Sequence, residues 1–88
     1  MVFEYDQEKS AANKQKHGID FPEAQAFWED KKLLRIQSAK LGEPRFIVIG
    51  MIEEKHWAAV ITYRSENIRL ISARRARPDE IEAYDEGI

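Results

Sequence analysis

The chain has 88 residues, of which 43% are hydrophobic and 34% charged. This composition is typical of a globular domain with a heavily charged surface, and we expect a single domain over residues 1–88. It contains no cysteine, which excludes a disulfide framework and a thiolate metal site. The net charge of −2 disfavours a protein that coats nucleic acid through general charge, and no apolar run approaches the roughly 20 residues that a membrane span needs.

The first residues and the two histidines narrow the class of protein further. Residues 1–9 lack a basic region followed by a long apolar core, so we expect no signal peptide and a cytoplasmic protein. His17 and His56 have no ligand spacing that indicates zinc, so neither a metal nor another cofactor is expected.

The first two predicted elements are a short strand and a helix. Residues 2–5 alternate as a short strand does. Asp6 is a suitable N-cap for a helix over residues 7–17, and Gly18 supplies the left-handed residue that ends it. This helix has few apolar residues, so it either packs weakly or presents its polar side chains to another group.

A second helix is predicted from its start signals. Asp20 is the expected N-cap, Pro22 stands in the first turn and Glu23 occupies the capping-box position. An apolar face follows at helical spacing, and the helix ends at residues 30–32. That face consists of Phe21, Ala24, Phe27 and Trp28.

From residue 33 onward, the spacing of the apolar residues changes from that of helices to that of β-strands. Strands are predicted at residues 33–37, 45–52, 57–64 and 68–73, with a turn at 40–44. The last strand carries apolar residues on both alternating faces, which indicates a central strand covered on both sides. Pro78 opens a final helix. We therefore predict an α+β domain, an antiparallel meander sheet packed on one side by two N-terminal helices and a C-terminal helix.

The charges near the C-terminal end are unevenly distributed. From Arg64 to Arg77 there are five arginines and one acid, Glu66, whereas residues 79–86 contain five acids and no base. A nearly neutral total therefore conceals a basic segment followed by an acidic one. The five arginines are Arg64, Arg69, Arg74, Arg75 and Arg77.

Four sequence blocks, in this order, cover nearly the whole chain: FEYDQEKSAANKQKHGIDFPEA, GEPRFIVIG, VITYR and IRLISARRARPDEIEAYD. Their most specific elements are Asn13 with Lys16-His17-Gly18 and Phe21, the Gly42-Glu43…Arg45 turn, and residues 71–76 with Glu80 and Tyr84 downstream. In this order and spacing the blocks resemble the BrnT family of toxins from bacterial type II toxin–antitoxin systems.

The resemblance implies a RelE-like α+β fold and a ribonuclease that stops translation. It also implies a ribbon-helix-helix antitoxin, BrnA-like, that neutralises the toxin and binds operator DNA, so that the toxin meets the operator only through its partner. A homodimer within that complex is a further option. Two positions depart from the family pattern, since Arg77 stands where threonine is usual and Ile81 where a base is frequent.

The arginine run suits phosphate chemistry. Cleavage of RNA by its own 2′-hydroxyl needs a base, an acid and cations that stabilise the phosphorane. Arginine suits the last role, because its planar fork holds phosphate oxygens bidentately and keeps its charge. Arg64 and Arg74, each near a strand end, converge on one phosphate if those ends meet at one edge of the sheet. Alternatively Arg69, Arg75 and Arg77 are solvated, pair with Glu80 or Glu82, or hold an acidic antitoxin tail.

Four other residues are candidates for the site. Histidine is the side chain whose reference pKa suits proton transfer at neutral pH, so His17 is a catalytic candidate. Lys16 is a candidate phosphate contact, although both residues are also ordinary stabilisers of a helix C-terminus. Glu80 acts either as a general base or as the residue that orients an arginine. Tyr84, one turn later, either reaches the same place as Glu80 or packs on the core with Ile81. Arg77 and Tyr84 join Lys16 as candidate substrate contacts.

The leading hypothesis is a metal-independent endoribonuclease toxin with Arg64, Arg74, Glu80 and His17 as catalytic candidates. The alternative is a catalytically weak or inactive binding module that docks an antitoxin or another protein, a reading favoured by the acidic net charge and by Arg77 and Ile81. A nucleic-acid-binding regulator is the third option, and the net charge disfavours it.

Overall fold

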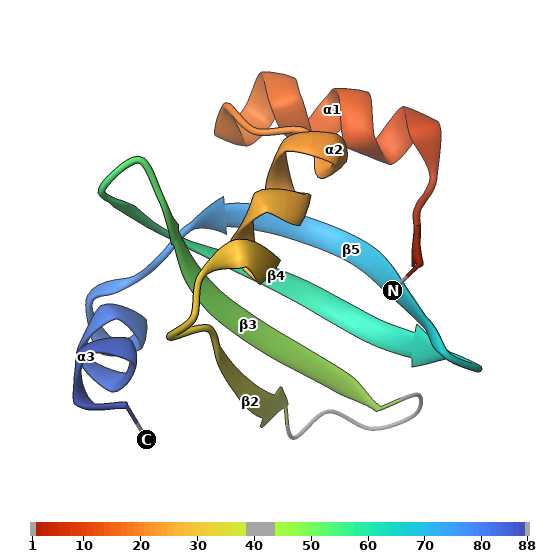
Figure 1. Cartoon of the computed structure of the whole chain (residues 1–88). Helices are drawn as coiled ribbons and strands as arrows, with labels where there is room; N and C mark the ends of the chain where they lie inside the picture. Colours follow the sequence, from red (N-terminus) through yellow and green to blue (C-terminus); the bar gives the residue numbers. More distant parts are fainter. Residues whose placement is uncertain (1, 39–43, 88) are drawn as a thin grey trace.

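The computed structural model describes residues 2–38 and 44–87 and has the α+β architecture expected from the sequence (Figure 1). The predicted order of elements is confirmed, with a 3₁₀ helix continuing the second helix. The predicted turn at residues 40–44 lies, except for Pro44, outside the described residues. The elements are β1 (Phe3–Glu4), α1 (Gln7–His17), α2 (Phe21–Ala24), the 3₁₀ helix η1 (Gln25–Glu29), β2 (Leu34–Ser38), β3 (Arg45–Ile52), β4 (Lys55–Arg64), β5 (Asn67–Arg75) and α3 (Pro78–Glu86).

The helix boundaries follow the predicted capping residues. The Asp6 carboxylate accepts hydrogen bonds from the backbone N–H groups of Glu8 and Lys9, at 2.8 and 3.1 Å. Gly18 has φ +81°, a left-handed conformation that glycine adopts without the cost of a Cβ clash. Asp20 and Glu23 form the expected capping box at the start of α2.

The sheet is mixed, in the order β1-β5-β4-β3-β2, so the prediction of a purely antiparallel meander is wrong for β1. β2 to β5 are antiparallel neighbours, whereas β1 pairs in parallel with β5. Consecutive strands joined by short links must reverse direction. β1 is separated from β5 by most of the chain, so no hairpin constrains its direction.

Helices cover both faces of the sheet, which corrects the prediction that all three lie on one side. α1, α2 and η1 cover one face, here called the helical face, where Phe21, Ala24 and Phe27 pack on residues of β3, β4 and β5. α3 packs on the opposite face, here called the open face, where Tyr84 contacts the cluster of Ile49 and Ala58. Figure 1 shows α3 apart from α1 and α2, at the end of the sheet near the β3–β4 turn. Most of the open face therefore has no helix over it.

A β-bulge interrupts the alternation of β5. Val60 pairs with Ser72 and the next residue, Ile61, pairs with Leu70, so Ile71 has no partner opposite it on β4. Leu70 and Ala73 are both buried on the helical face, whereas Ile71 and Ser72 both turn to the open face. The prediction of a strand covered on both sides is therefore wrong, because the apolar residues of β5 are redistributed by one extra residue.

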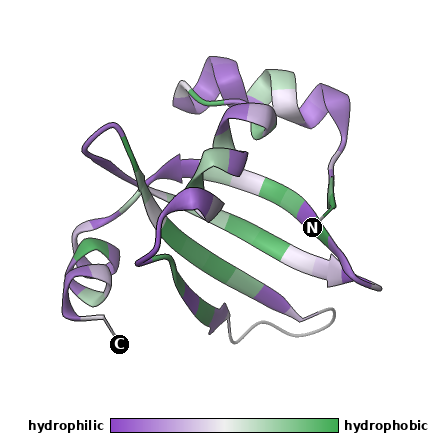
Figure 2. Cartoon of the chain, viewed as in Figure 1, coloured by the Kyte–Doolittle hydropathy of each residue, from purple (hydrophilic) through white to green (hydrophobic). Residues whose placement is uncertain are grey.

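Asn13 explains how the polar helix α1 attaches to the sheet. Its side-chain amide donates hydrogen bonds of 2.8 Å to the carbonyls of Ile19 and Ala73, and its oxygen accepts a 3.2 Å bond from Ala73 N–H. Asn13 thus occupies the edge of β5 beyond the two residues of β1, much as a neighbouring strand would. Figure 2 shows α1 mostly hydrophilic beside the hydrophobic centres of β3 and β4. Within residues 2–38 and 44–87, no helix is long and apolar enough to cross a membrane.

Candidate functional site

The open face collects arginines from three strands. Alternation along β3, β4 and β5 assigns Arg45, Arg64, Arg69 and Arg74 to this face. Arg69 and Arg74 are five residues apart, so an unbroken strand would send them to opposite faces. The bulge at Ile71 adds one residue and returns both to the same face.

A groove of about 330 Å³ lies in the middle of this face. Its floor is aliphatic, its rim carries three arginines, and hydroxyl groups stand at two places. The lining residues are Ser38, Arg45, Ile47, Val60, Ile71, Ser72, Arg74 and Arg77. They come from β2, β3, β4, β5 and the segment that joins β5 to α3, so the groove crosses most of the sheet.

Arg74 and Glu80 form a bidentate ion pair at one end of the groove. The two terminal nitrogens of Arg74 donate to the two carboxylate oxygens of Glu80 at 2.7 and 2.8 Å. The pair is largely withdrawn from solvent, with side-chain exposures of 19% for Arg74 and 10% for Glu80. The charge of Arg74 is thus matched within the protein, and its orientation is set by Glu80.

The same carboxylate also caps α3. Glu80 Oε1 accepts a 2.8 Å hydrogen bond from the backbone N–H of Arg77, at the N-terminus of the helix. The Arg74 guanidinium, followed by this backbone bond, outweighs burial and lowers the pKa of Glu80 below its ordinary value. The Glu80 carboxylate in turn raises the pKa of Arg74. Of the two roles open to Glu80, this geometry matches the carboxylate that orients an arginine.

Arg45 and Arg77 differ from Arg74 in their partners. Within the described residues, neither arginine forms an ion pair with a carboxylate. Arg69, further along the open face, is paired with Glu4 at 3.2 Å. As far as the described residues go, the cations that the groove offers to an anionic ligand without breaking an internal ion pair are therefore Arg45 and Arg77.

Arg64 and Arg74 do not converge, so that expectation is wrong. Arg64 pairs with Asn67 beside the β4–β5 turn, whereas Arg74 pairs with Ala58 near the start of β4. The two arginines thus lie at opposite ends of one hairpin, separated by about 20 Å of extended strand. The two arginines lie far apart because each is near the C-terminal end of its strand, and consecutive antiparallel strands run in opposite directions.

Lys16 and His17 lie on the other side of the sheet from the groove. They end α1, which is attached to β5 through Asn13, and the chain that follows packs Ile19 and Phe21 in the core on the helical face. Lys16 is exposed and His17 partly so. The structure therefore does not bring them together with Arg74, Arg77 or Glu80.

Tyr84 belongs to the core beneath α3 and does not line the groove. It is 7% exposed, and its hydroxyl donates a 2.6 Å hydrogen bond to Asp30 Oδ2. Burial and this bond raise the pKa of Tyr84 to about 12. Burial pushes the pKa of Asp30 upward, but hydrogen bonds from Tyr84 and from the N–H groups of Lys32 and Met51 together hold it below its ordinary value. This network attaches α3 to the end of η1 and to β3.

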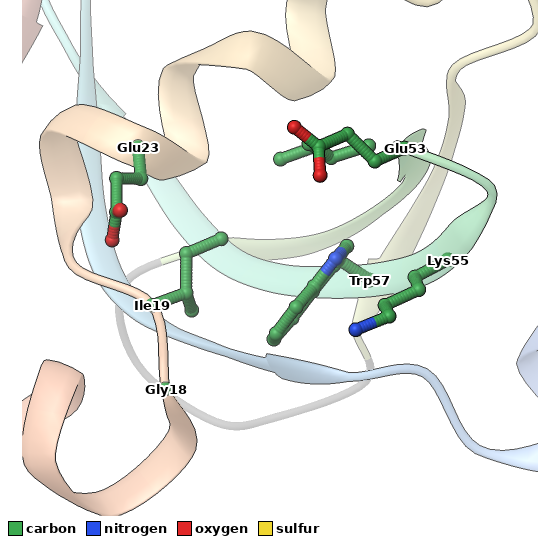
Figure 3. A pocket seen from close by; sticks show the side chains of 7 residues that line it. Gly18, Ile19, Glu23, Glu53, Lys55 and Trp57 are labelled. Carbon is green, nitrogen blue, oxygen red and sulfur yellow. The ribbon is translucent and has the colours of Figure 1, made fainter.

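Arg75 points away from Arg74 and stacks on the helical side of the sheet. Its guanidinium lies 5.4 Å from the ring centre of Trp57, and its Nε donates to the His56 carbonyl at 3.3 Å. Trp57 is part of the wall of a second cavity, of about 340 Å³. Figure 3 shows this cavity, with Ile19 and Trp57 beside one another and Glu53 and Lys55 on the β3–β4 hairpin.

Arg45 is the groove arginine that the sequence-based site prediction omits. It begins β3 opposite Ser38 and shares a face with Ile47, two residues later. Its place at the start of a strand is visible in the sequence. The face to which it points depends on which side of β3 the helices cover, and no local signal reveals that.

The fold and the groove define a small α+β protein whose groove holds, among the described residues, two arginines without an ion-pair partner and one arginine fixed by a carboxylate. This arrangement is suited to a phosphate-bearing ligand. A family model described as "Ribonuclease toxin, BrnT, of type II toxin-antitoxin system" matches residues 5–80. The chain therefore belongs to the BrnT family of type II toxin–antitoxin ribonuclease toxins. Membership implies an antitoxin partner. No curated relative matches the chain.

Proposed function

We propose that this protein is an endoribonuclease toxin that binds an RNA phosphodiester in the groove and stops translation by cutting RNA without a metal. The family match supports a ribonuclease toxin, and the arginines of the groove support the location. The observation that carries the proposal is the grouping of Arg45, Arg74 and Arg77 at one groove on the open face. The five-stranded sheet and its helices are compatible with the RelE-like fold that the resemblance implies.

The three arginines have different roles in this proposal. Arg45 and Arg77 contact non-bridging oxygens of the phosphate, since their charges have no internal partner among the described residues. Arg74, oriented by Glu80, adds positive potential at a defined place. As the 2′-oxygen attacks phosphorus and the 5′-oxygen leaves, negative charge accumulates on the equatorial oxygens, and cations placed there in advance stabilise that state.

The other predicted site residues have smaller roles in the proposed reaction. Lys16 and His17 lie on the opposite side of the sheet from the groove. A role for them therefore requires RNA to extend out of the groove and contact that side. Arg64 is a candidate for contact with a more distant phosphate on the open face. Tyr84 acts through the position of α3, because its hydroxyl is bound to Asp30.

The proposed cellular setting follows the family. The antitoxin is proposed to be a ribbon-helix-helix protein that carries operator DNA binding, with a toxin homodimer as an option within the complex. The proposed compartment is the cytoplasm.

The test is cleavage of a labelled RNA by purified protein in the presence of a chelator. Wild type is expected to release a fragment ending in a 2′,3′-cyclic phosphate. Arg77→Ala and Arg45→Ala are each expected to slow cleavage about a hundredfold to a thousandfold, the range seen for loss of one charge-stabilising group. Arg75→Ala is the matched control, since it removes the same charge two residues from Arg77 on the other side of the sheet.

Equal rates for Arg77→Ala and Arg75→Ala would remove the groove from the proposal. The family description does not favour the alternative of an inactive binding module. A tight antitoxin complex, combined with no cleavage by the free protein and no growth arrest on induction in bacteria, would nevertheless establish that alternative.

A further inference from the structure

An aliphatic stripe crosses four strands of the open face: Ile47, Val60 and Ile71 line the groove, and Ile36 extends the stripe beyond it onto β2. Ile36 pairs with Ile47, Ile47 pairs with Val60, and Ile71 stands beside Ser72, the partner of Val60. Ile36 is 38% exposed, and the other three side chains are partly exposed. Binding of RNA phosphates does not account for this stripe, because phosphates and sugars offer little apolar surface to bury against four branched aliphatic side chains.

The stripe has dimensions that match one face of a helix. Three strand spacings of about 4.8 Å give it a length of about 14 Å. About ten or eleven residues of α-helix cover the same distance, and their apolar side chains at i, i+3 or i+4, i+7, and i+10 or i+11 recur at a spacing close to that of the strands. A short amphipathic helix laid across the strands therefore places one apolar side chain over each of them.

The charge at the rim of the groove determines which charge a helix must carry to bind there. Arg45 and Arg77 flank the stripe without a carboxylate partner among the described residues, and the charge of Arg74 is matched by Glu80. The surplus charge beside the stripe is positive. A helix with acidic residues on both sides of its apolar face is complementary to it, whereas a basic helix is repelled.

We propose that the antitoxin binds this groove with a short amphipathic helix, apolar on one face and acidic at its flanks, in the helix-in-groove manner. The partner is implied by the family, and the chemistry of the docking segment is assigned from the stripe and its arginines. Where the groove is also the RNA site, as proposed above, the antitoxin and RNA exclude one another, and neutralisation is direct competition. That consequence rests on the proposed function, but the docking itself does not.

The cavity beside Trp57 is the competing docking place. Its wall is also partly apolar, with Ile19, Ile52 and Trp57. Its charges are mixed, because Glu53 and Lys55 stand on the same hairpin and Glu23 is bound by Lys14 at 2.7 Å. It therefore offers no charge complementarity comparable with that of the groove.

The experiment measures binding of the toxin to the antitoxin from the neighbouring reading frame by titration calorimetry. Ile36→Thr and Ile71→Thr, which lie at the two ends of the stripe and outside the core clusters, keep a β-branched side chain and remove its apolar end. Combined, they are expected to weaken binding about tenfold or more. Val2→Thr is the matched control, because Val2 is 58% exposed and lies outside the groove, and it is expected to change the affinity less than twofold.

Short overlapping peptides of the antitoxin then identify the segment that binds. The binding peptide is expected to carry apolar residues at helical spacing between acidic residues, to gain helical circular dichroism on binding, and to displace a labelled RNA from the toxin. A double threonine variant that binds the antitoxin as tightly as wild type, with binding lost instead in Trp57→Ala, would overturn the proposal. A peptide that binds through the stripe while no RNA binds the free toxin would retain the docking site and remove the proposed RNA site.

Discussion

Arg74 and Glu80 face one another through two parallel hydrogen bonds of 2.7 and 2.8 Å, and the same carboxylate holds the first turn of α3. One ion pair therefore joins the end of β5, the groove and the C-terminal helix. Its strength affects both the stability of the fold and the place of the groove arginines.

Arg74→Ala is expected to destabilise the protein by about 3 kcal/mol, because it leaves the Glu80 carboxylate buried without its partner. Arg74→Met combined with Glu80→Leu removes both charges and should recover most of that loss, leaving a deficit of about 1 kcal/mol from the missing helix cap. Urea unfolding of the three proteins measures both values. A double variant no more stable than Arg74→Ala contradicts the account of an unpaired buried charge.

Acid should unfold the wild type through the same pair. The folded-state pKa of Glu80 lies below its unfolded value of about 4.3, so the pair stabilises the fold above that pH and loses its effect as the pH falls through the lower folded value. Glu80→Gln keeps an acceptor for the Arg77 N–H but does not titrate. We expect its stability to fall less than that of wild type between about pH 5 and pH 3. Parallel curves for the two proteins would show that other carboxylates dominate.

Tyr84→Phe is expected to cost about 2 kcal/mol, because Asp30 loses one hydrogen bond while its carboxylate stays in place. The pKa of Tyr84 is raised to about 12, above its unfolded value of about 10. The bond therefore stabilises the protein fully below about pH 10 and loses its effect as the pH rises towards 12. The ultraviolet absorbance of tyrosinate measures this, and the step near pH 12 should vanish in Tyr84→Phe.

Asn13→Ala is expected to cost about 3 kcal/mol, because it removes three hydrogen bonds and leaves buried backbone groups of Ile19 and Ala73 without partners. Gln15, two residues later, is exposed, so Gln15→Ala is the matched control and should be nearly neutral. Thermal unfolding followed by circular dichroism measures both. Equal melting temperatures for the two variants would show that α1 is held by its other contacts.

Local signals predict most of the secondary structure. Asp6, Gly18, Asp20 and Pro78 mark helix ends through bonds within a few residues, and the structure has them where the sequence indicates. The ion pair of Arg74 is also short-range, since Glu80 follows six residues later across one turn. The alternatives for Glu80 included the orientation of an arginine, which is the arrangement observed.

The site as a whole depends on contacts between distant parts of the chain. Arg45 enters the groove because η1 covers the other face of β3. Arg64 is excluded from the region of Arg74 because β4 and β5 are antiparallel and finish at opposite ends of their hairpin. Lys16 and His17, which belong to a sequence block that resembles the family, lie on the far side of the sheet from the groove.

The sequence by itself determined the helix ends, the strand segments and the concentration of arginines near β5, because these depend on the chemistry of neighbouring residues. The tertiary structure alone decided which arginines share a face. Arg69 and Arg74 stand on one face only because Ile71 is an extra residue in the pairing of β5 with β4, and a bulge depends on the register between two strands. A shift of one residue reverses the direction of every later side chain, so the groove is defined by strand pairing and not by the order of residues along β5.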